Sequence, residues 1–311
     1  TTAVGLGILP RVAPVIAAGL RARKAAGVAA PLNIVACENG VRATSRLKSS
    51  VYEALDAATA AWADQRVGFA DSSVDRIVPP IAFPEPLDVA VEAFHEWNVE
   101  RSAWVGELPQ IAGMHLTDTL EAHVERKLFT LNTGHCSTAY LGNLRGCVTI
   151  AEALADERIF AAVKGAMEQS GEALIRKFGF DRARHAVYID AVLRRFRNPY
   201  LRDTVARVGH DPVRKLSAPL YFAYPITLAA GYGLPVDKLA FAAAAALRFD
   251  DPADAQCAEI RATIADAGLR GAIRRFTGID DETIVGTIAD AYARIPAWIG
   301  GEEHKLNPKQ K

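Results

Sequence analysis

The spacing of the apolar residues changes partway along the chain, and this change limits the possible folds. In the first part, short β-prone runs at 32–37 and 67–70 alternate with helical patterns at 12–26 and 42–64. Strands that alternate with helices pair in parallel through right-handed crossovers. Beyond this part, helical spacing continues almost to the end. We therefore expect an α/β fold with a partial parallel sheet, followed by a mostly α-helical C-terminal domain.

A loop rich in Gly and Pro, at 106–113, marks the expected domain boundary. We place the first domain at 1–110 and the helical domain at 111–311. Before the loop, alternating apolar residues at 89–99 predict an edge or added strand.

Helix ends in the second domain are indicated by local signals. Asp118-x-x-Glu121 and Thr149-x-x-Glu152 have the capping-box pattern of a helix start, and Gly179 suits a helix end. Helices are predicted at 149–178, 181–196, 236–248, 253–267 and 281–293.

Net charge and cysteine content argue against several classes of protein. The 36 Lys and Arg residues balance the 36 Asp and Glu residues, so the chain lacks the basic field of a general nucleic-acid-binding protein. The longest apolar run, 239–247, is far shorter than the roughly 18 residues of a membrane span. Four dispersed cysteines favour a reducing, cytoplasmic setting. We expect neither a nucleic acid nor a membrane as partner, and the oligomeric state stays open.

The most informative stretch for chemistry is 125–140, ERKLFTLNTGHCSTAY. On the helix expected there, Lys127, Asn132 and His135 lie within an arc of about 140°, at about 100° per residue, and can point into one cleft. Apolar neighbours would lower the pKa of the Lys127 amine by desolvation, and a neutral lysine can act as a general base. The alternative is a surface lysine beside a capped asparagine and a core histidine.

A second candidate is Asn39, which follows the strand at 32–37. Open parallel sheets bind ligands at the carboxyl ends of their strands. The Asn39 amide could donate to an oxygen that gains negative charge, and Asn132 could do the same. Asn-Gly is also a common turn, so a purely structural role stays open.

A third feature is basic. From Arg194 to Lys215, seven Lys or Arg residues accompany two Asp residues. This excess suits a phosphate or carboxylate, because arginine forks bind such groups with two parallel hydrogen bonds. Residues 208–212 break the helical spacing, so Arg207, Arg214 and Lys215 are expected at the ends of a loop. The alternative is a solvated charged face.

Competing chemistries lack their signatures. The seven histidines form no H-E-x-x-H or similar ligand cluster, so we expect no metal. Gly5-x-Gly7 lacks the third glycine of a dinucleotide fingerprint, and the sequence has neither a G-x-S-x-G elbow nor a Walker loop. Nucleophilic hydrolysis and nucleoside triphosphate hydrolysis are therefore not supported.

Lys127-x4-Asn132-x2-His135 resembles the K-x4-N-x2-H signature of the polyol-specific long-chain dehydrogenases, the mannitol dehydrogenase family. The resemblance extends to ACENGVRATSRLK and VGFADSSVDRIVPP in the first part of the chain. In the second part it covers 125–142, 161–180 and 195–217, and it is greatest to the branch that acts on a polyol phosphate. It implies a partial Rossmann-like sheet, with NAD as cofactor.

The resemblance implies catalytic roles for four residues. Lys127 corresponds to the general base that removes the hydroxyl proton while a hydride leaves the same carbon for nicotinamide. Asn39 and Asn132 correspond to the pair that stabilises the oxyanion, and His135 corresponds to the histidine that orients the substrate.

Binding roles follow from the same resemblance. Asp75 matches a position near the polyol hydroxyls. Arg207 and Lys215 match a substrate-binding pair, which we expect on a phosphate with help from Arg214. The residues expected beside the cofactor are Thr2, Ala3, Val4 and Asn39.

The reaction so implied interconverts D-mannitol 1-phosphate and D-fructose 6-phosphate, with a sugar or polyol phosphate as the binding partner and no metal. Family members begin with a Gly-rich strand, turn and helix, and on the order of 60 or more residues would precede Thr1. Two alternatives stay open. One is a family member that acts on an unphosphorylated polyol or a hexuronate, and the other is a noncatalytic sugar-phosphate-binding remnant.

Overall fold

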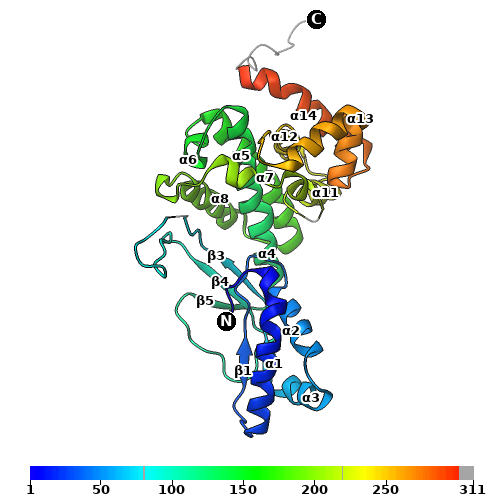
Figure 1. Ribbon diagram of the computed structural model, residues 1–311. Coiled ribbons are helices and arrows are strands. Elements are labelled where there is room, and N and C mark those ends of the chain that lie inside the picture. Colours follow the sequence, from blue (N-terminus) through cyan, green and yellow to red (C-terminus); the bar gives the residue numbers. More distant parts are fainter. Residues whose placement is uncertain (80, 219, 301–311) are drawn as a thin grey trace, which may run out of the picture. The chain divides into compact units, whose positions relative to one another are not determined.

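The structure is a computed structural model, and it describes residues 1–79, 81–218 and 220–300. Its internal contacts divide the chain into two compact units (Figure 1). The first comprises Thr1–Val78 and Val91–Val124, and the second comprises Pro79–Ala90 and the chain from Glu125 onward.

The first unit begins as an α/β arrangement around two short parallel strands. Its elements are η1 (Leu6–Ile8), α1 (Leu9–Ala25), β1 (Leu32–Ile34), α2 (Ala43–Glu53), α3 (Ala57–Arg66) and β2 (Val67–Phe69). The two strands pair in parallel with Asn33 opposite Gly68. Thr2 adds a parallel bridge to Ala36. The predicted parallel pairing is therefore confirmed.

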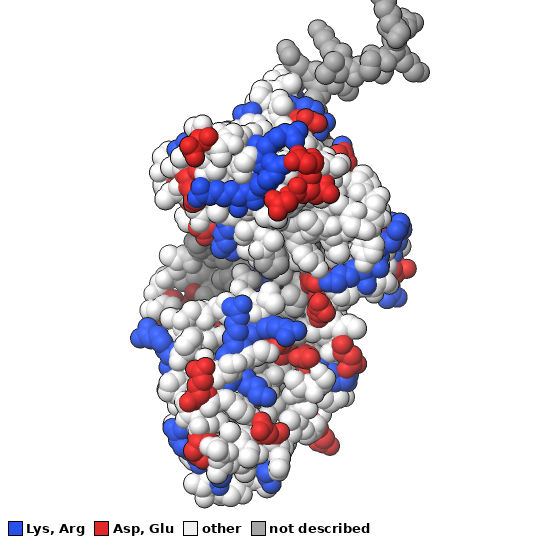
Figure 2. All heavy atoms as spheres, turned by 90° about the vertical axis from the view of Figure 1, so that its right-hand side faces the viewer, with Lys and Arg blue, Asp and Glu red and all other residues white. Residues whose placement is uncertain are grey.

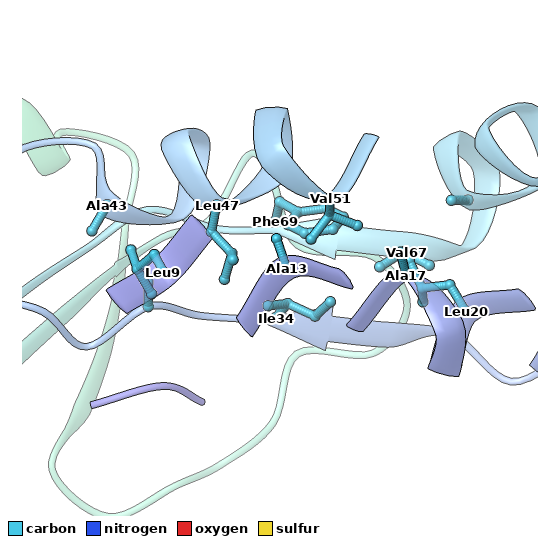
Figure 3. Close-up of a cluster of buried hydrophobic side chains, with 12 residues drawn as sticks. Leu9, Ala13, Ala17, Leu20, Ile34, Ala43, Leu47, Val51, Val67 and Phe69 are labelled. Atoms are coloured by element: carbon cyan, nitrogen blue, oxygen red, sulfur yellow. The ribbon is translucent and has the colours of Figure 1, made fainter. Parts of the chain in front are cut away.

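Apolar side chains from α1, α2 and both strands meet in one cluster (Figure 3). Every third or fourth residue along one side of α1 is buried in it, at Leu9, Ala13, Ala17 and Leu20. The labelled members are Leu9, Ala13, Ala17, Leu20, Ile34, Ala43, Leu47, Val51, Val67 and Phe69.

Three further strands form a second sheet in the order β3–β4–β5. They are β3 (Ser72–Asp75), β4 (Glu96–Glu100) and β5 (Met114–Thr117). The central strand pairs antiparallel with β3 and parallel with β5. The strand predicted at 89–99 is wrong before Glu96, and β3 and β5 were not predicted. Strands of four residues are too short for a convincing alternation.

Two predicted helices are each divided by an aspartate that starts a new helix. Asp56 accepts a backbone N–H from three residues on, and it divides the predicted helix 42–64 into α2 and α3. Asp156 does the same between α6 (Ile150–Ala153) and α7 (Glu157–Phe178). Such side chains satisfy the free N–H groups at a helix start. Apolar periodicity alone does not reveal these breaks.

From α4 onward the chain is helical, as expected. Besides α6 and α7, the elements are α4 (Leu120–Arg126), η2 (Lys127–Asn132), α5 (Thr133–Leu144), α8 (Arg182–Phe196), η3 (Pro199–Leu201), α9 (Val205–Gly209), α10 (Pro212–Leu216), α11 (Ala223–Gly231), α12 (Asp237–Ala246), α13 (Ala255–Thr277) and α14 (Glu282–Gly300).

The predicted helix ends have mixed outcomes. The capping box of Thr149 and Glu152 is confirmed, and so is Gly179 at φ 70° as the end of α7. The start predicted at Asp118 is wrong, because α4 begins at Leu120 and the Asp118 carboxylate lies 3.4 Å from Arg101 Nε. The helix predicted at 253–267 ends there, because Gly268 interrupts α13 with φ 70° and ψ 168°, whereas the helix predicted at 281–293 continues further as α14.

α5 is the central helix of the second unit. It contacts α6, α7, α9 and α12, and most of its residues are buried. A Cβ at Gly134 would lie 2.5 Å from Met167 Sδ, so glycine is what lets α5 approach α7 this closely. The alanine-rich segment of α12 packs against the same helices. The side chains at the start of α5 therefore project from a tightly packed scaffold.

The charged side chains do not separate by sign on the face shown in Figure 2. Basic and acidic groups lie next to one another there, as expected from the balanced composition. In the part of the chain that the structure describes, no helix is both long and apolar enough to cross a membrane.

We expect Gly68→Ala to destabilise the first unit by roughly 1–3 kcal/mol, the usual cost of overpacking a core. A Cβ at Gly68 would lie 2.0 Å from Asn33 Oδ1, and that side chain exchanges two 2.9 Å hydrogen bonds with the Val105 backbone. Gly19→Ala is the matched control, because this exposed helical glycine has open space around it. The control should be neutral or stabilising. Urea unfolding measures both, and equal midpoints would contradict the packing argument.

His185 is a buried histidine in the core of the second unit. It is 4% exposed, and its ring lies against Gly171 and beside the rings of Phe180 and Tyr188. Its pKa is lowered to about 4, mainly by burial and also by the nearby Arg126, while Glu172 opposes the shift. The folded state therefore holds this imidazole neutral.

Acidification should destabilise the second unit through His185. The folded pKa lies below the unfolded value, so the stability is present above pH 6.5 and is lost as the pH falls towards 4. Between pH 7 and pH 5 the loss is about 2 kcal/mol. His185→Leu should remove this part of the pH dependence, whereas His115→Leu, at an exposed position on β5, should keep it. Urea unfolding at both pH values decides, and an unchanged slope in His185→Leu would refute the assignment.

Candidate functional site

The sequence predicted that the signature residues Lys127, Asn132 and His135 share one continuous α-helix. The structure differs from this prediction. Lys127–Asn132 form a π-helical segment, η2, between α4 and α5. A π-turn closes hydrogen bonds between residues five apart, so its first and last residues are about one turn from each other. Lys127 and Asn132 therefore lie on the same side, closer in angle than the expected arc of about 140°. His135 follows within the first turn of α5.

Buried hydroxyl groups secure this π-helical segment. Ser170 of α7 donates a hydrogen bond to the carbonyl of Phe129, in the middle of η2. Thr133 donates to the Tyr221 carbonyl at 2.6 Å, and its hydroxyl also lies 3.4 Å from the Leu128 carbonyl. Both hydroxyl residues are fully buried. These hydroxyl groups thus connect η2 to α7 and the start of α5 to the Tyr221 backbone.

A charged pair lies next to the start of η2. Lys177 Nζ is 2.6 Å from Glu125 Oε1 and 3.0 Å from the Tyr224 hydroxyl. Burial alone would lower the pKa of Lys177, but hydrogen bonds with Glu125 and Tyr224 outweigh it and raise the pKa. The Tyr224 ring stacks on Phe129 at 4.6 Å. Lys177 therefore stays an ammonium ion, which distinguishes it from a proton acceptor.

His135 and Arg207 meet at one carboxylate, that of Asp203. His135 Nε2 lies 2.8 Å from Asp203 Oδ2, although the ring N–H is not aligned with that oxygen. Arg207 donates from Nε at 2.8 Å and from Nη2 to Asp203 Oδ1. Burial alone would raise the pKa of Asp203, but His135 and Arg207 outweigh it and lower the pKa. The structure therefore joins two residues that the sequence predicted separately.

Asp203 was not predicted as a site residue. In the sequence it is one of two aspartates among the seven basic residues from Arg194 to Lys215. The signal that could have found it is the spacing of Asp203 and Arg207, four residues apart at the start of a helix. The contact with His135 joins segments far apart in the sequence, and no local pattern predicts it.

Arg214 and Lys215 lie on α10 in different environments. The Lys215 side chain is buried, and its Nζ donates to the carbonyls of Val208 and His210. Burial lowers its pKa. Arg214 is half exposed, with Nε 3.6 Å from Asp211 Oδ2. Lys215 therefore fixes the loop between α9 and α10, and Arg214 is the more accessible cation.

Tyr221 is a second residue that the sequence analysis missed. Burial is the main cause of its raised pKa, and interactions of its hydroxyl with Arg214 and Asn132 oppose that shift. It thereby connects the last residue of η2 with the basic α10. Nothing in the sequence around Tyr221 marks it, because its partners come from two other elements.

His210, Asp211 and Asp254 place possible metal-ligand atoms within 4.8 Å of one another. Both oxygens of Asp254 already accept backbone N–H groups, from Asp211 at 2.8 Å and from Gln256 at 3.0 Å. Asp211 lies near Arg214, as described above. These contacts show the cluster in a capping role, connecting α10 to the start of α13.

The remaining predicted residues belong to the first unit. Asn39 is exposed, five residues beyond the end of β1. Asp75 is buried at the end of β3, opposite Glu96. Ala3 and Val4 are exposed, whereas Thr2 pairs with the backbone of Val35 and Cys37 at 3.0 and 2.9 Å.

Glu38 organises the segment predicted to lie beside a cofactor. Its carboxylate is 5% exposed and accepts hydrogen bonds from the Thr2 hydroxyl at 3.0 Å, the Val4 N–H at 2.9 Å and the Gly5 N–H at 2.8 Å. These two N–H groups are therefore already used within the protein. A ligand at this edge would meet the exposed parts of Ala3 and Val4 instead.

Comparison with known proteins gives the same two-part organisation. A model of the mannitol dehydrogenase Rossmann domain matches residues 1–113, and a model of the mannitol dehydrogenase C-terminal domain matches residues 119–295. The Rossmann-like sheet and the helical second domain expected from the sequence are thus confirmed.

Two solved structures share the fold. One is Pseudomonas fluorescens mannitol 2-dehydrogenase in ternary complex with NAD and D-mannitol, at 21% identity and TM-score 0.69. The other is a D-sorbitol dehydrogenase in substrate-free form, at 20% identity and TM-score 0.77. Each similarity covers 93% of this chain, which spans 66% and 67% of the respective relatives. Because the two domain models together match most of the sequence, the chain belongs to the mannitol dehydrogenase family.

Proposed function

We propose that this protein catalyses NAD-dependent oxidation of a polyol and the reverse reduction, with Lys127 as the general base. The observation that carries this proposal is the π-helical segment, which presents Lys127 and Asn132 on one side immediately before His135. A proton acceptor, an amide donor and an imidazole at one end of a buried helix suit removal of a hydroxyl proton.

Each residue then has a defined task. Lys127, whose side chain is partly buried, accepts the proton of the reacting hydroxyl. Asn132 donates to the same oxygen as negative charge develops there, and Asn39 is the proposed second donor. His135 orients a neighbouring hydroxyl. Bound NAD supplies the acceptor for the hydride that leaves the carbinol carbon.

The first unit offers a fitting place for the nicotinamide end of NAD. Thr2–Val4 lies along the carboxyl edge of the parallel strands, through the Thr2–Ala36 bridge, and ligands of such sheets bind at this edge. Ala3 and Val4 are exposed there, and the Val4 N–H donates a hydrogen bond to the buried Glu38 that shapes the segment. We therefore assign Thr2, Ala3, Val4 and Asn39 to this part of the cofactor site.

For the substrate, we favour a polyol phosphate, with D-mannitol 1-phosphate and D-fructose 6-phosphate as the pair. The long motif resemblance to that branch of the family supports this choice, and so does the basic segment of α9 and α10. Arg207 and Arg214 have half or more of their side chains exposed, so both present N–H donors to solvent. Asp75 is proposed to meet the polyol hydroxyls.

An unphosphorylated polyol is the second candidate, and it has support of its own. Arg207 already binds Asp203, and Lys215 already binds two loop carbonyls, so part of the positive charge is satisfied internally. The two solved relatives are named for mannitol and sorbitol, neither of which carries a phosphate.

Replacing Lys127 by Met tests the catalytic proposal. We expect kcat for fructose 6-phosphate reduction to fall by about 10²- to 10⁴-fold, because the proton donor and acceptor is lost. Binding of NADH, followed by fluorescence, should be preserved. Lys238→Met, at an exposed position of the second unit, is the control and should keep wild-type kcat. Wild-type turnover in Lys127→Met at its optimal pH would reject the base, and failure of NADH binding in the parent protein would favour the noncatalytic alternative.

Substrate choice is tested by comparing kcat/KM for fructose 6-phosphate, fructose and a hexuronate. We expect the phosphate to be preferred, and Arg207→Gln to raise its KM by about 10- to 100-fold through loss of a charge-assisted contact. Arg194→Gln, an exposed arginine of α8, is the matched control and should leave KM unchanged. Equal kcat/KM for fructose and its phosphate would instead support an unphosphorylated polyol.

A further inference from the structure

Asp203 is a buried carboxylate whose two oxygens serve two different residues. Oδ2 lies against His135 of α5, and Oδ1 accepts from Arg207 of α9. Asp203 is 6% exposed, His135 is 17% exposed and Arg207 is 57% exposed. The carboxylate therefore lies beneath two more accessible side chains, and it contacts solvent little itself.

The backbone around Asp203 is held in place on both sides. Arg202 is left-handed at φ 49°, which turns the chain immediately before Asp203. The Asp203 carbonyl accepts the Ile150 N–H at 2.9 Å, and Thr204 forms an antiparallel bridge with Thr149. Thr204 also caps α9 by accepting the Arg207 N–H at 3.2 Å. The backbone that carries the carboxylate is therefore fixed. From this position the carboxylate contacts side chains of two helices, α5 and α9.

The His135 ring is fixed from two directions. One face stacks on Phe196 of α8, with centroids 4.5 Å apart and planes 15° apart. Asp203 approaches its Nε2 edge at 2.8 Å. A carboxylate at one ring nitrogen determines which nitrogen carries the proton and leaves the other for a ligand. The ring N–H is not aligned with the Asp203 oxygen, and catalytic hydrogen bonds commonly tighten only when substrate binds.

We propose that Asp203 is a positioning residue that couples His135 to Arg207. This inference rests on the proposed function, in which His135 orients the polyol and Arg207 binds the distal group of the substrate. One buried anion shared by two partners makes their interactions interdependent. When an anionic group of the substrate draws the Arg207 guanidinium towards itself, Asp203 interacts more strongly with His135. Binding of the distal group thereby orders the imidazole at the reacting end.

Histidine ring ¹⁵N NMR tests this coupling without cofactor or substrate. Arg207→Gln should shift the His135 ring signals, although these two residues interact only through Asp203 in our proposal. Asp203→Asn should shift them as well, and adding Arg207→Gln to that background should cause no further shift. The control Asp190→Asn removes another paired carboxylate, 2.9 Å from Lys164 on α7, and should leave the His135 signals unchanged. Wild-type His135 signals in Arg207→Gln would overturn the proposal, even if Asp203→Asn fails to fold.

Kinetics provide the second readout. Asp203→Asn should reduce kcat/KM by about 10- to 100-fold, as for other residues that orient a functional histidine. The losses caused by His135→Asn and Arg207→Gln should be non-additive in the parent protein and additive in Asp203→Asn. Additive losses in both backgrounds would reject the coupling. If the parent protein turns over no polyol, the proposed function fails, while the NMR measurement still decides whether Asp203 couples the two residues.

Discussion

The candidate site depends on one local departure from helical regularity, the π-helical segment Lys127–Asn132. A regular α-helix would place the two residues about 140° apart around the axis, whereas the π-turn brings them closer in angle. This geometry is maintained from outside the segment, by the Ser170 hydroxyl on the Phe129 carbonyl and by the Thr133 hydroxyl on the Tyr221 carbonyl. Close packing of α5 on α7 keeps these hydroxyl groups within reach.

Charge pairing determines what the basic segment can offer to a ligand. A count of charges along the sequence suggests several free cations, but each has a different environment in the folded chain. Lys215 is buried against loop carbonyls, Arg207 binds Asp203, and Arg214 is half exposed beside Asp211. Burying a charge is costly unless it is paired and hydrogen-bonded, which explains why the buried cation is also well satisfied.

Much of the architecture followed from residue patterns. The α1 helix, the parallel pairing of β1 and β2, and the ends of helices at Thr149 and Gly179 were predicted, because each depends on periodicity or on a local cap. The division of helices at Asp56 and Asp156 was missed, since an apolar repeat continues across a cap. The short strands β3 and β5 carry too few residues for their alternation to be read.

By itself, the sequence determined which residues are available for chemistry, since the spacing of Lys127, Asn132 and His135 and the cluster of arginines are properties of the chain. Tertiary structure decided how they are held. Asp203 meets His135 across distant segments, and Tyr221 meets both Asn132 and Arg214. Such contacts arise only when helices pack, because the desolvation that makes a buried carboxylate or phenol seek partners does not exist in the extended chain.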